Sequence, residues 1–183
     1  VWKFTPHQST LLATPIYSQK NNLVLVGSDQ GWFYALNAKT GQLIWKKEFK
    51  NQTLSTPGLD GEERIVVICG NPTKTSADER ASLTVLDVKT GTIILSTSEL
   101  DYFFGTYGTP VIYKNLVIFT SLDKHIHAVN FKSGQQLWTV DTGARVFSTP
   151  SIIVIKGKAR LYVGSNNSVL YEIEPETGIE IGR

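Results

Sequence analysis

The stretch ALNAKTGQLIW (Ala35–Trp45) places a Thr-Gly turn between two short apolar runs and returns a Trp four residues after the Gly. Gly adopts a positive φ angle without steric cost, so Thr40-Gly41 suits a tight turn between two strands. The stretch AVNFKSGQQLW (Ala128–Trp138) repeats the same plan. One copy would predict only a hairpin, whereas its recurrence predicts a repeat architecture.

Three markers recur in phase along the chain. The first is a tripeptide that ends in Gly: Lys39-Thr40-Gly41, Lys89-Thr90-Gly91, Lys132-Ser133-Gly134 and Glu176-Thr177-Gly178, at intervals of 43 to 50 residues. The second is a Thr-Pro pair: Thr14-Pro15, Thr56-Pro57, Thr109-Pro110 and Thr149-Pro150. The third is the residue four positions after each Gly: Trp45, Leu95, Trp138 and Gly182, with Trp2 in the same phase of an earlier unit.

Each unit contains short runs rich in β-branched and aromatic residues. In the first unit these runs are 22–27, 31–36 and 42–45, and the segment after the Thr-Pro pair supplies one more strand. No segment shows a sustained helical period. Four short strands per unit predict an all-β fold, a β-propeller of four-stranded antiparallel blades. We expect a single domain over 1–183 with four blades at about 3–47, 48–97, 98–140 and 141–183.

The number of blades in the intact ring stays open at this stage. The markers from Trp2 to Gly182 enclose four periods. We expect these blades to be part of a larger ring of about seven or eight blades. A half-ring completed by self-association with a second chain, and a small closed ring of four blades, are the alternatives. The chain begins at Val1 and contains no Met, so we expect a processed or partial chain.

The Trp after each turn lies on the predicted fourth strand, where it offers a large flat face to the next blade. We therefore expect Trp45 and Trp138 to lie between blades and hold them together. Leu95 and Gly182 stand at the matching positions, so we expect weaker packing at those junctions. The predicted structural docking residues are Gly41, Trp45, Gly91, Gly134, Trp138 and Gly178.

The stretch 35–45 resembles the tryptophan-docking motif A-x-D-x-x-T-G-x-x-x-W of the PQQ-like β-propeller family, the pyrroloquinoline-quinone repeats of the BamB and quinoprotein type. Asn37 and Asn130 replace the Asp of that motif, and Asp87 retains it. The resemblance covers nearly the whole chain and implies the propeller fold. It implies much less about function, because the repeat occurs in enzymes, scaffolds and sensors.

Composition excludes several classes of function. A net charge of +2 gives no basis for nucleic-acid binding, and no apolar run is long enough for a membrane span. Cys69 is the single cysteine and follows an apolar run, so we expect a buried structural thiol. The quinoprotein members of the family use PQQ, a bound cation, a catalytic carboxylate and often a vicinal Cys pair, which this chain lacks. We expect no catalytic residue and no cofactor.

Two histidines alternate along one predicted strand. His125 and His127 point to the same face, a spacing that suits a metal ion. A metal site needs further ligands, and the sequence alone places no partner beside them. The matching positions in the first unit hold Trp32 and Tyr34, which indicates a general surface or packing role. We therefore predict no metal site.

Four aromatic residues lie in the connection between the second and third units: Tyr102, Phe103, Phe104 and Tyr107. They could fill the space left by Leu95 in place of Trp, which is the interpretation the sequence favours. They are also the candidate partner-binding residues, because buried aromatic side chains contribute much of the binding energy at protein interfaces. The polar insertion at 71–79 is a second candidate loop, although surface insertions are commonly tolerated.

Three hypotheses about function follow. The favoured one is a non-catalytic propeller scaffold that binds a protein or peptide partner. The alternatives are a fragment of a PQQ-dependent quinoprotein dehydrogenase, and a ligand-sensing extracytoplasmic domain of a receptor or stress-sensor kinase. The resemblance implies a periplasmic or extracellular location.

Overall fold

The computed structural model describes residues 1–6, 9–49, 52–53, 55–61, 63–70, 81–97 and 105–182. Within these ranges the chain forms strands and turns, and no helix is present. It follows that no helix with the length and hydropathy of a membrane span occurs among the described residues.

The strands form four sheets, each made of four consecutive strands. The first contains β1 (Ile16–Ser18), β2 (Leu23–Gly27), β3 (Trp32–Asn37) and β4 (Leu43–Glu48). The second contains β5 (Gly58–Asp60), β6 (Arg64–Cys69), β7 (Ser82–Asp87) and β8 (Ile93–Thr97). The third contains β9 (Val111–Tyr113), β10 (Leu116–Thr120), β11 (His125–Asn130) and β12 (Gln136–Asp141). The fourth contains β13 (Ser151–Ile155), β14 (Lys158–Gly164), β15 (Leu170–Ile173) and β16 (Glu180–Gly182).

All four sheets share one topology, in which each strand pairs antiparallel with the next. The pairing of the third and fourth strands shifts register at the same place in every sheet. The shift lies between Ala35 and Leu36, Val85 and Leu86, Ala128 and Val129, and Glu172 and Ile173. The prediction of an all-β fold with four-stranded antiparallel blades is confirmed.

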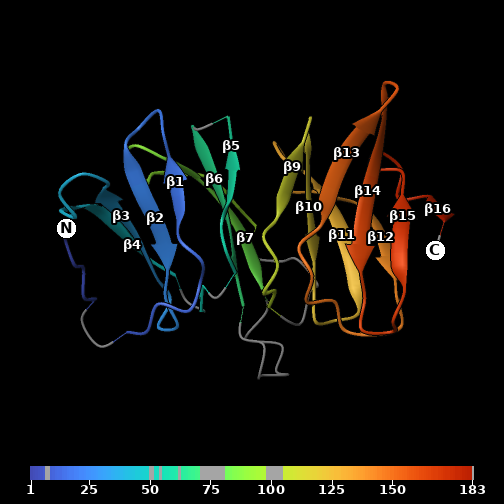
Figure 1. Cartoon of the computed structure of the whole chain (residues 1–183), viewed down its shortest axis with the longest axis horizontal. Coiled ribbons are helices and arrows are strands. Elements are labelled where there is room, and N and C mark those ends of the chain that lie inside the picture. Colours follow the sequence, from blue (N-terminus) through green and yellow to red (C-terminus); the bar gives the residue numbers. More distant parts are fainter. Residues whose placement is uncertain are drawn as a thin grey trace.

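The sheets stand side by side in sequence order, and the two chain termini lie at opposite ends of the row (Figure 1). The first strands of successive sheets approach one another, since β9 contacts both β5 and β13. These first strands therefore mark the inner edge of the arrangement. Among the described residues the first and fourth sheets do not meet, which disagrees with the alternative of a closed four-bladed ring.

An apolar layer fills each junction between adjacent sheets. Leu25 and Phe33 of the first sheet pack with Ile65 and Val67 of the second. Alternate residues of a strand point to opposite faces, so the inner strands of the second and third sheets are apolar on both faces. The junction between the second and third sheets buries Val66, Leu83, Val117 and Phe119. The junction between the third and fourth sheets buries Ile118, Ile126, Leu161 and Tyr171. Burying each such side chain stabilises the fold by about 1.5–3 kcal/mol.

The outward face of the fourth sheet departs from this pattern. Glu172 stands at the position held by Ala35 in the first sheet, and the Nε atom of Arg160 lies 3.0 Å from its Oε1 atom. Leu170, at the position of the buried Phe33, is exposed. This outward face therefore carries both an ion pair and the exposed apolar side chain of Leu170.

Candidate functional site

The turn between the third and fourth strands is built in the same way in the first three sheets, whereas in the fourth sheet Glu174 accepts a hydrogen bond from the hydroxyl of Thr177 at 2.6 Å. In the first sheet the Oδ1 atom of Asn37 accepts hydrogen bonds from the amides of Lys39 and Thr40, at 2.9 and 3.0 Å. Asp87 accepts a similar bond from Thr90 in the second sheet, at 2.7 Å. The Asn in place of the motif Asp therefore keeps the bonds that hold the turn.

Each turn ends at a Gly in the left-handed region, with φ angles of 72° at Gly41, 69° at Gly91, 71° at Gly134 and 74° at Gly178. A side chain at these positions would be strained by the backbone alone. The turns that end at Gly91, Gly134 and Gly178 point at the fourth strand of the preceding sheet.

Trp45 and Trp138 each contact the turn of the following sheet. The Nε1 atom of Trp45 donates to the carbonyl of Val88 at 3.0 Å, and a Cβ on Gly91 would come within 2.7 Å of the ring. Trp138 donates to the carbonyl of Pro175 at 3.0 Å, and Gly178 is equally close to its ring. We propose that these indole–glycine contacts hold neighbouring sheets together.

Trp2 makes the same contact with the first sheet, although it precedes every strand. Its Nε1 atom donates to the carbonyl of Ala38 at 2.9 Å, and a Cβ on Gly41 would lie 2.5 Å from its ring. The third turn lacks an indole. A Cβ on Gly134 would overlap the methyl group of Thr97 and approach Leu95 to 3.6 Å. Thr97 and Leu95 thus cover the turn glycine between the second and third sheets.

Replacing Leu95 by Ala tests whether this junction is the weaker one. Leu95 is half-buried against the apolar layer between the second and third sheets, and it donates no hydrogen bond. We expect Leu95→Ala to lower the free energy of unfolding by about 1–2 kcal/mol, less than removal of an indole at the other junctions. Urea unfolding followed by circular dichroism measures the change, and a loss as large as that of Trp45→Ala would contradict the expectation.

Exposed apolar side chains recur in the connections that lead into the first strands. Leu12, Tyr107 and Phe147 each lie two residues before the Thr of a Thr-Pro pair, and they are 64%, 44% and 42% exposed. The rings of Tyr107 and Phe147 stack with centroids 5.8 Å apart. We call these three residues the apolar row. They lie next to the inner edge of the arrangement, where the first strands converge.

Loops between second and third strands share this side of the molecule with the apolar row. The amide of Leu122 donates to the carbonyl of Gly105 at 3.4 Å, and the amide of Val146 donates to that of Ser121 at 3.2 Å. The sequence-predicted aromatic cluster is only partly placed by the structure. Tyr107 belongs to the apolar row, whereas Tyr102, Phe103 and Phe104, like the insertion at 71–79, lie outside the described residues.

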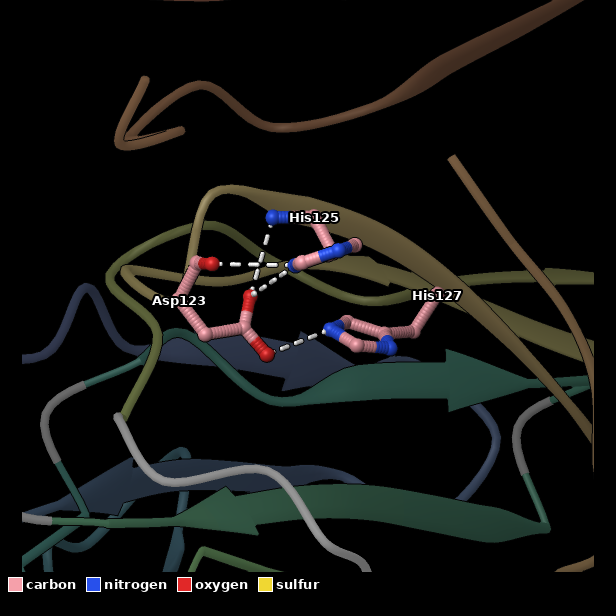
Figure 2. Close-up of side chains that lie close together, drawn as sticks. All are labelled: Asp123, His125 and His127. Atoms are coloured by element: carbon pink, nitrogen blue, oxygen red, sulfur yellow. Dashed lines mark hydrogen bonds and ion pairs between the residues drawn. The ribbon is translucent and has the colours of Figure 1, made fainter. Parts of the chain in front are cut away.

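Asp123, His125 and His127 form a cluster at the start of β11 (Figure 2). The Nε2 atom of His127 lies 2.9 Å from Oδ2 of Asp123, and the Nδ1 atom of His125 lies 3.6 Å from Oδ1. The His127 ring is buried and stacks on Phe119, with ring centroids 5.1 Å apart. The fold therefore brings an acidic residue, Asp123, next to the two histidines, which the sequence alone did not predict.

The carboxyl group of Asp123 is held in its ionised form. Burial raises the pKa of Asp123, but hydrogen bonds from His127 and from the amide of His125 lower it, as does the positive charge of either ring when it is protonated. The net result is a pKa below the usual value for Asp. A carboxylate is thus available at neutral pH as a ligand or as an acceptor.

The thiol of Cys69 is not a reactive group. Cys69 is fully buried at the end of β6, and burial raises its pKa far above the usual range. A thiol that stays protonated is a poor nucleophile and a poor metal ligand. The interpretation of Cys69 as a packing residue agrees with its position in the structure.

Sequence reasoning missed three features of these sites. Phe147 and Leu12 were not singled out, although their constant offset from the Thr-Pro pairs is visible in the sequence. Asp123 was also missed, although Asp, His and His alternate at positions 123, 125 and 127. Thr97 gave no signal, because its contact with Gly134 depends on how the two sheets pack.

The family described as "Outer membrane protein assembly factor BamB" matches residues 1–99 and 69–183, which together span the chain. The chain belongs to the PQQ-like β-propeller family. The assembly factor BamB of Legionella pneumophila (strain Paris) is 26% identical over 166 residues, covering 89% of this chain and 41% of the relative. A quinoprotein ethanol dehydrogenase of Pseudomonas putida is 40% identical over 58 residues, covering 30% of this chain and 9% of the relative.

A solved structure has the same fold. BamB from Moraxella catarrhalis superposes with a TM-score of 0.72 at 19% identity, covering 96% of this chain and 50% of the BamB chain. This PQQ-like propeller chain therefore spans half or less of the length of these relatives.

Proposed function

We propose that this chain is a non-catalytic propeller scaffold that binds a protein partner in the periplasm during outer-membrane protein assembly. The observation that carries the proposal is the apolar row of Leu12, Tyr107 and Phe147. The family match over the whole chain supports the assembly role, because that family is described as an outer membrane protein assembly factor. The location follows from the same analogy.

The apolar row has the properties of a docking surface. Its members are exposed at the same phase of the first, third and fourth units, which places them along one side of a rigid set of sheets. Aromatic side chains lose little conformational entropy on binding and bury a large area, so they commonly anchor protein interfaces. The stacked rings of Tyr107 and Phe147 would present one such anchor to a partner.

A partner of different sequence suits this chain better than a second copy. In the three junctions within the chain apolar faces meet, whereas the outward face of the fourth sheet carries the Arg160–Glu172 ion pair. Docking a second copy there would desolvate both charges, which costs several kcal/mol unless new partners replace water. Self-association to complete a ring is therefore the less favoured form of partner binding.

Photocrosslinking tests the proposal. A photoreactive amino acid at Phe147, in the cells that produce the protein, is expected to form an adduct with a component of the outer-membrane assembly machinery. Changing Leu12 and Tyr107 to Ser in the same chain is expected to weaken binding of the purified partner by about 30-fold or more, since interface anchors contribute at least 2 kcal/mol.

The matched control lies on the outer strands. Ile44, Ile94 and Leu137 are as exposed as the apolar row but lie on β4, β8 and β12. Replacing Ile94 and Leu137 by Ser is expected to leave binding unchanged. Loss of binding in this control, with retention in the apolar-row variant, would contradict the proposal.

A quinoprotein dehydrogenase fragment is the second candidate, favoured by the 40% identity over 58 residues. The residues of this chain do not fit the cofactor well, because Cys69 is the only cysteine and is buried, so no vicinal Cys pair is available. Addition of PQQ with Ca²⁺ to the chain separates the two candidates. A bound-quinone absorption spectrum would favour the dehydrogenase and count against the scaffold.

A further inference from the structure

We propose that Asp123, His125 and His127 bind one divalent transition-metal ion of the Zn²⁺ type. The three residues supply two imidazole nitrogens and one carboxylate oxygen, the donor set that such ions prefer. Asp123 lies on the loop between β10 and β11, both histidines lie on β11, and the cluster is separate from the indole–glycine contacts. Nothing in the scaffold proposal requires it.

The donor atoms already have the spacing of a metal site. Around a tetrahedral Zn²⁺ ion, ligand atoms lie about 3.3 Å apart, given bonds of about 2.0–2.1 Å. The Asp123–His127 and Asp123–His125 distances of 2.9 and 3.6 Å bracket that value, and all three donors lie within 4.8 Å of one another. The two imidazole nitrogens lie within 4.8 Å of each other, so the more exposed His125 ring would have to turn toward His127 to complete a tetrahedral set.

The backbone holds the cluster in place before any ion binds. The amide of His125 donates to Oδ1 of Asp123 at 2.9 Å, and the amide of Asp123 donates to the hydroxyl of Ser121 at 3.2 Å. The carbonyl of Lys124 accepts hydrogen bonds from both the amide and the hydroxyl of Thr142, at 2.9 and 3.0 Å. A loop fixed in this way loses little conformational entropy when it binds a ligand.

The corresponding loop of the fourth sheet shows which part of the cluster the fold itself requires. Asn167 there donates to the hydroxyl of Tyr171 at 2.7 Å and accepts from the amide of Val169 at 3.0 Å. An Asn and a Tyr thus make the same link between loop and strand without any metal ligand. In the third sheet the three matching positions hold Asp123, His125 and His127, all of which can bind a metal ion. The hydrogen bond between loop and strand does not require two histidines, so their presence needs another explanation.

One side of the cluster is open and the other is closed. The side chain of His127 is 3% exposed, whereas that of His125 is 35% exposed. An ion could enter from the His125 side, and a water molecule could complete the fourth position. The ion would take the place of the proton between His127 Nε2 and Asp123 Oδ2, which binding releases to solvent. The proton that His125 Nδ1 shares with the Asp123 carbonyl at 2.9 Å would move to Nε2 of that ring, which frees Nδ1 as a ligand.

Calorimetric titration of Zn²⁺ into the metal-free chain tests the proposal. We expect saturable binding of one ion per chain, and Co²⁺ in the same site should show the visible absorption of a tetrahedral complex. Asp123→Asn and His125→Gln should each weaken Zn²⁺ binding about tenfold or more. His125→Gln changes the most exposed of the three side chains, so its melting temperature should match that of the unchanged chain.

Two variants serve as controls. Tyr171→Phe removes the equivalent hydrogen bond of the fourth sheet, and His7→Gln removes the remaining histidine of the sequence. Both should retain the affinity for Zn²⁺. Absence of one-to-one binding, or equal affinity in His125→Gln and the unchanged chain, would overturn the proposal. A loss confined to His7→Gln would place the ion elsewhere and overturn it as well.

Discussion

Replacing Trp138 by Ala is expected to lower the free energy of unfolding by about 3–5 kcal/mol and the melting temperature by roughly 6–20 °C. Trp138 is buried in the layer between the third and fourth sheets, in the same apolar cluster as Ile118 and Leu161. Truncation would remove this contact area, leave a cavity over Gly178, and deprive the Pro175 carbonyl of its donor at 3.0 Å. Urea unfolding followed by circular dichroism measures the loss.

Two further variants divide this effect into its parts. Trp138→Phe keeps an aromatic ring but removes the N–H that donates to the Pro175 carbonyl. We expect the missing hydrogen bond to lower the free energy of unfolding by about 1 kcal/mol, in addition to the effect of the smaller ring on packing. Leu137→Ala alters the neighbouring exposed residue on the opposite face of β12 and should change stability by about 0.5 kcal/mol or less. If Trp138→Ala were no more destabilising than Leu137→Ala, the indole would not hold the sheets together.

Most of the fold was predictable because the same turn and strand signals recur in each unit of the sequence. Each Thr-Gly or Ser-Gly turn, such as Thr40-Gly41, requires a positive φ angle, and that requirement is visible in the residue type. The short runs rich in β-branched and aromatic residues at 22–27 and 31–36 identify strands without any knowledge of their neighbours. Agreement among turn chemistry, periodicity and spacing leaves few other folds available.

The candidate sites were less predictable because they depend on contacts between units. The carboxylate of Asp123 meets His127 only when the loop after β10 folds back over β11, a backbone path that single residue types do not determine. Tyr107 and Phe147 are 40 residues apart and stack because two connections lie side by side in neighbouring sheets. The exposed fraction of a side chain likewise depends on what packs beside it, as Leu170 shows on the outward face of the fourth sheet.

Replacing Gly178 by Ala is expected to destabilise the fold by about 2–5 kcal/mol. Two effects add: the left-handed backbone disfavours any Cβ by about 1–2 kcal/mol, and forcing a methyl group into a packed contact costs about 1–3 kcal/mol. The new Cβ would lie 2.7 Å from the Cδ2 atom of Trp138, so the indole must shift. Gly143 provides the matched control, because its φ of 72° is close to the 74° of Gly178 and no atom lies within 4 Å of its Cβ position.

Comparison of Gly178→Ala with Gly143→Ala separates the cost of the contact with the Trp138 ring from the cost of the positive φ angle. Gly143→Ala should lose only the backbone contribution, about 1–2 kcal/mol, partly offset by the reduced entropy of the unfolded chain. In a chain that already carries Trp138→Ala, the additional loss from Gly178→Ala should fall to the level of Gly143→Ala, because the ring is no longer there to be displaced. A difference between Gly178→Ala and Gly143→Ala that persists without the ring would show that the turn glycine serves something other than the indole.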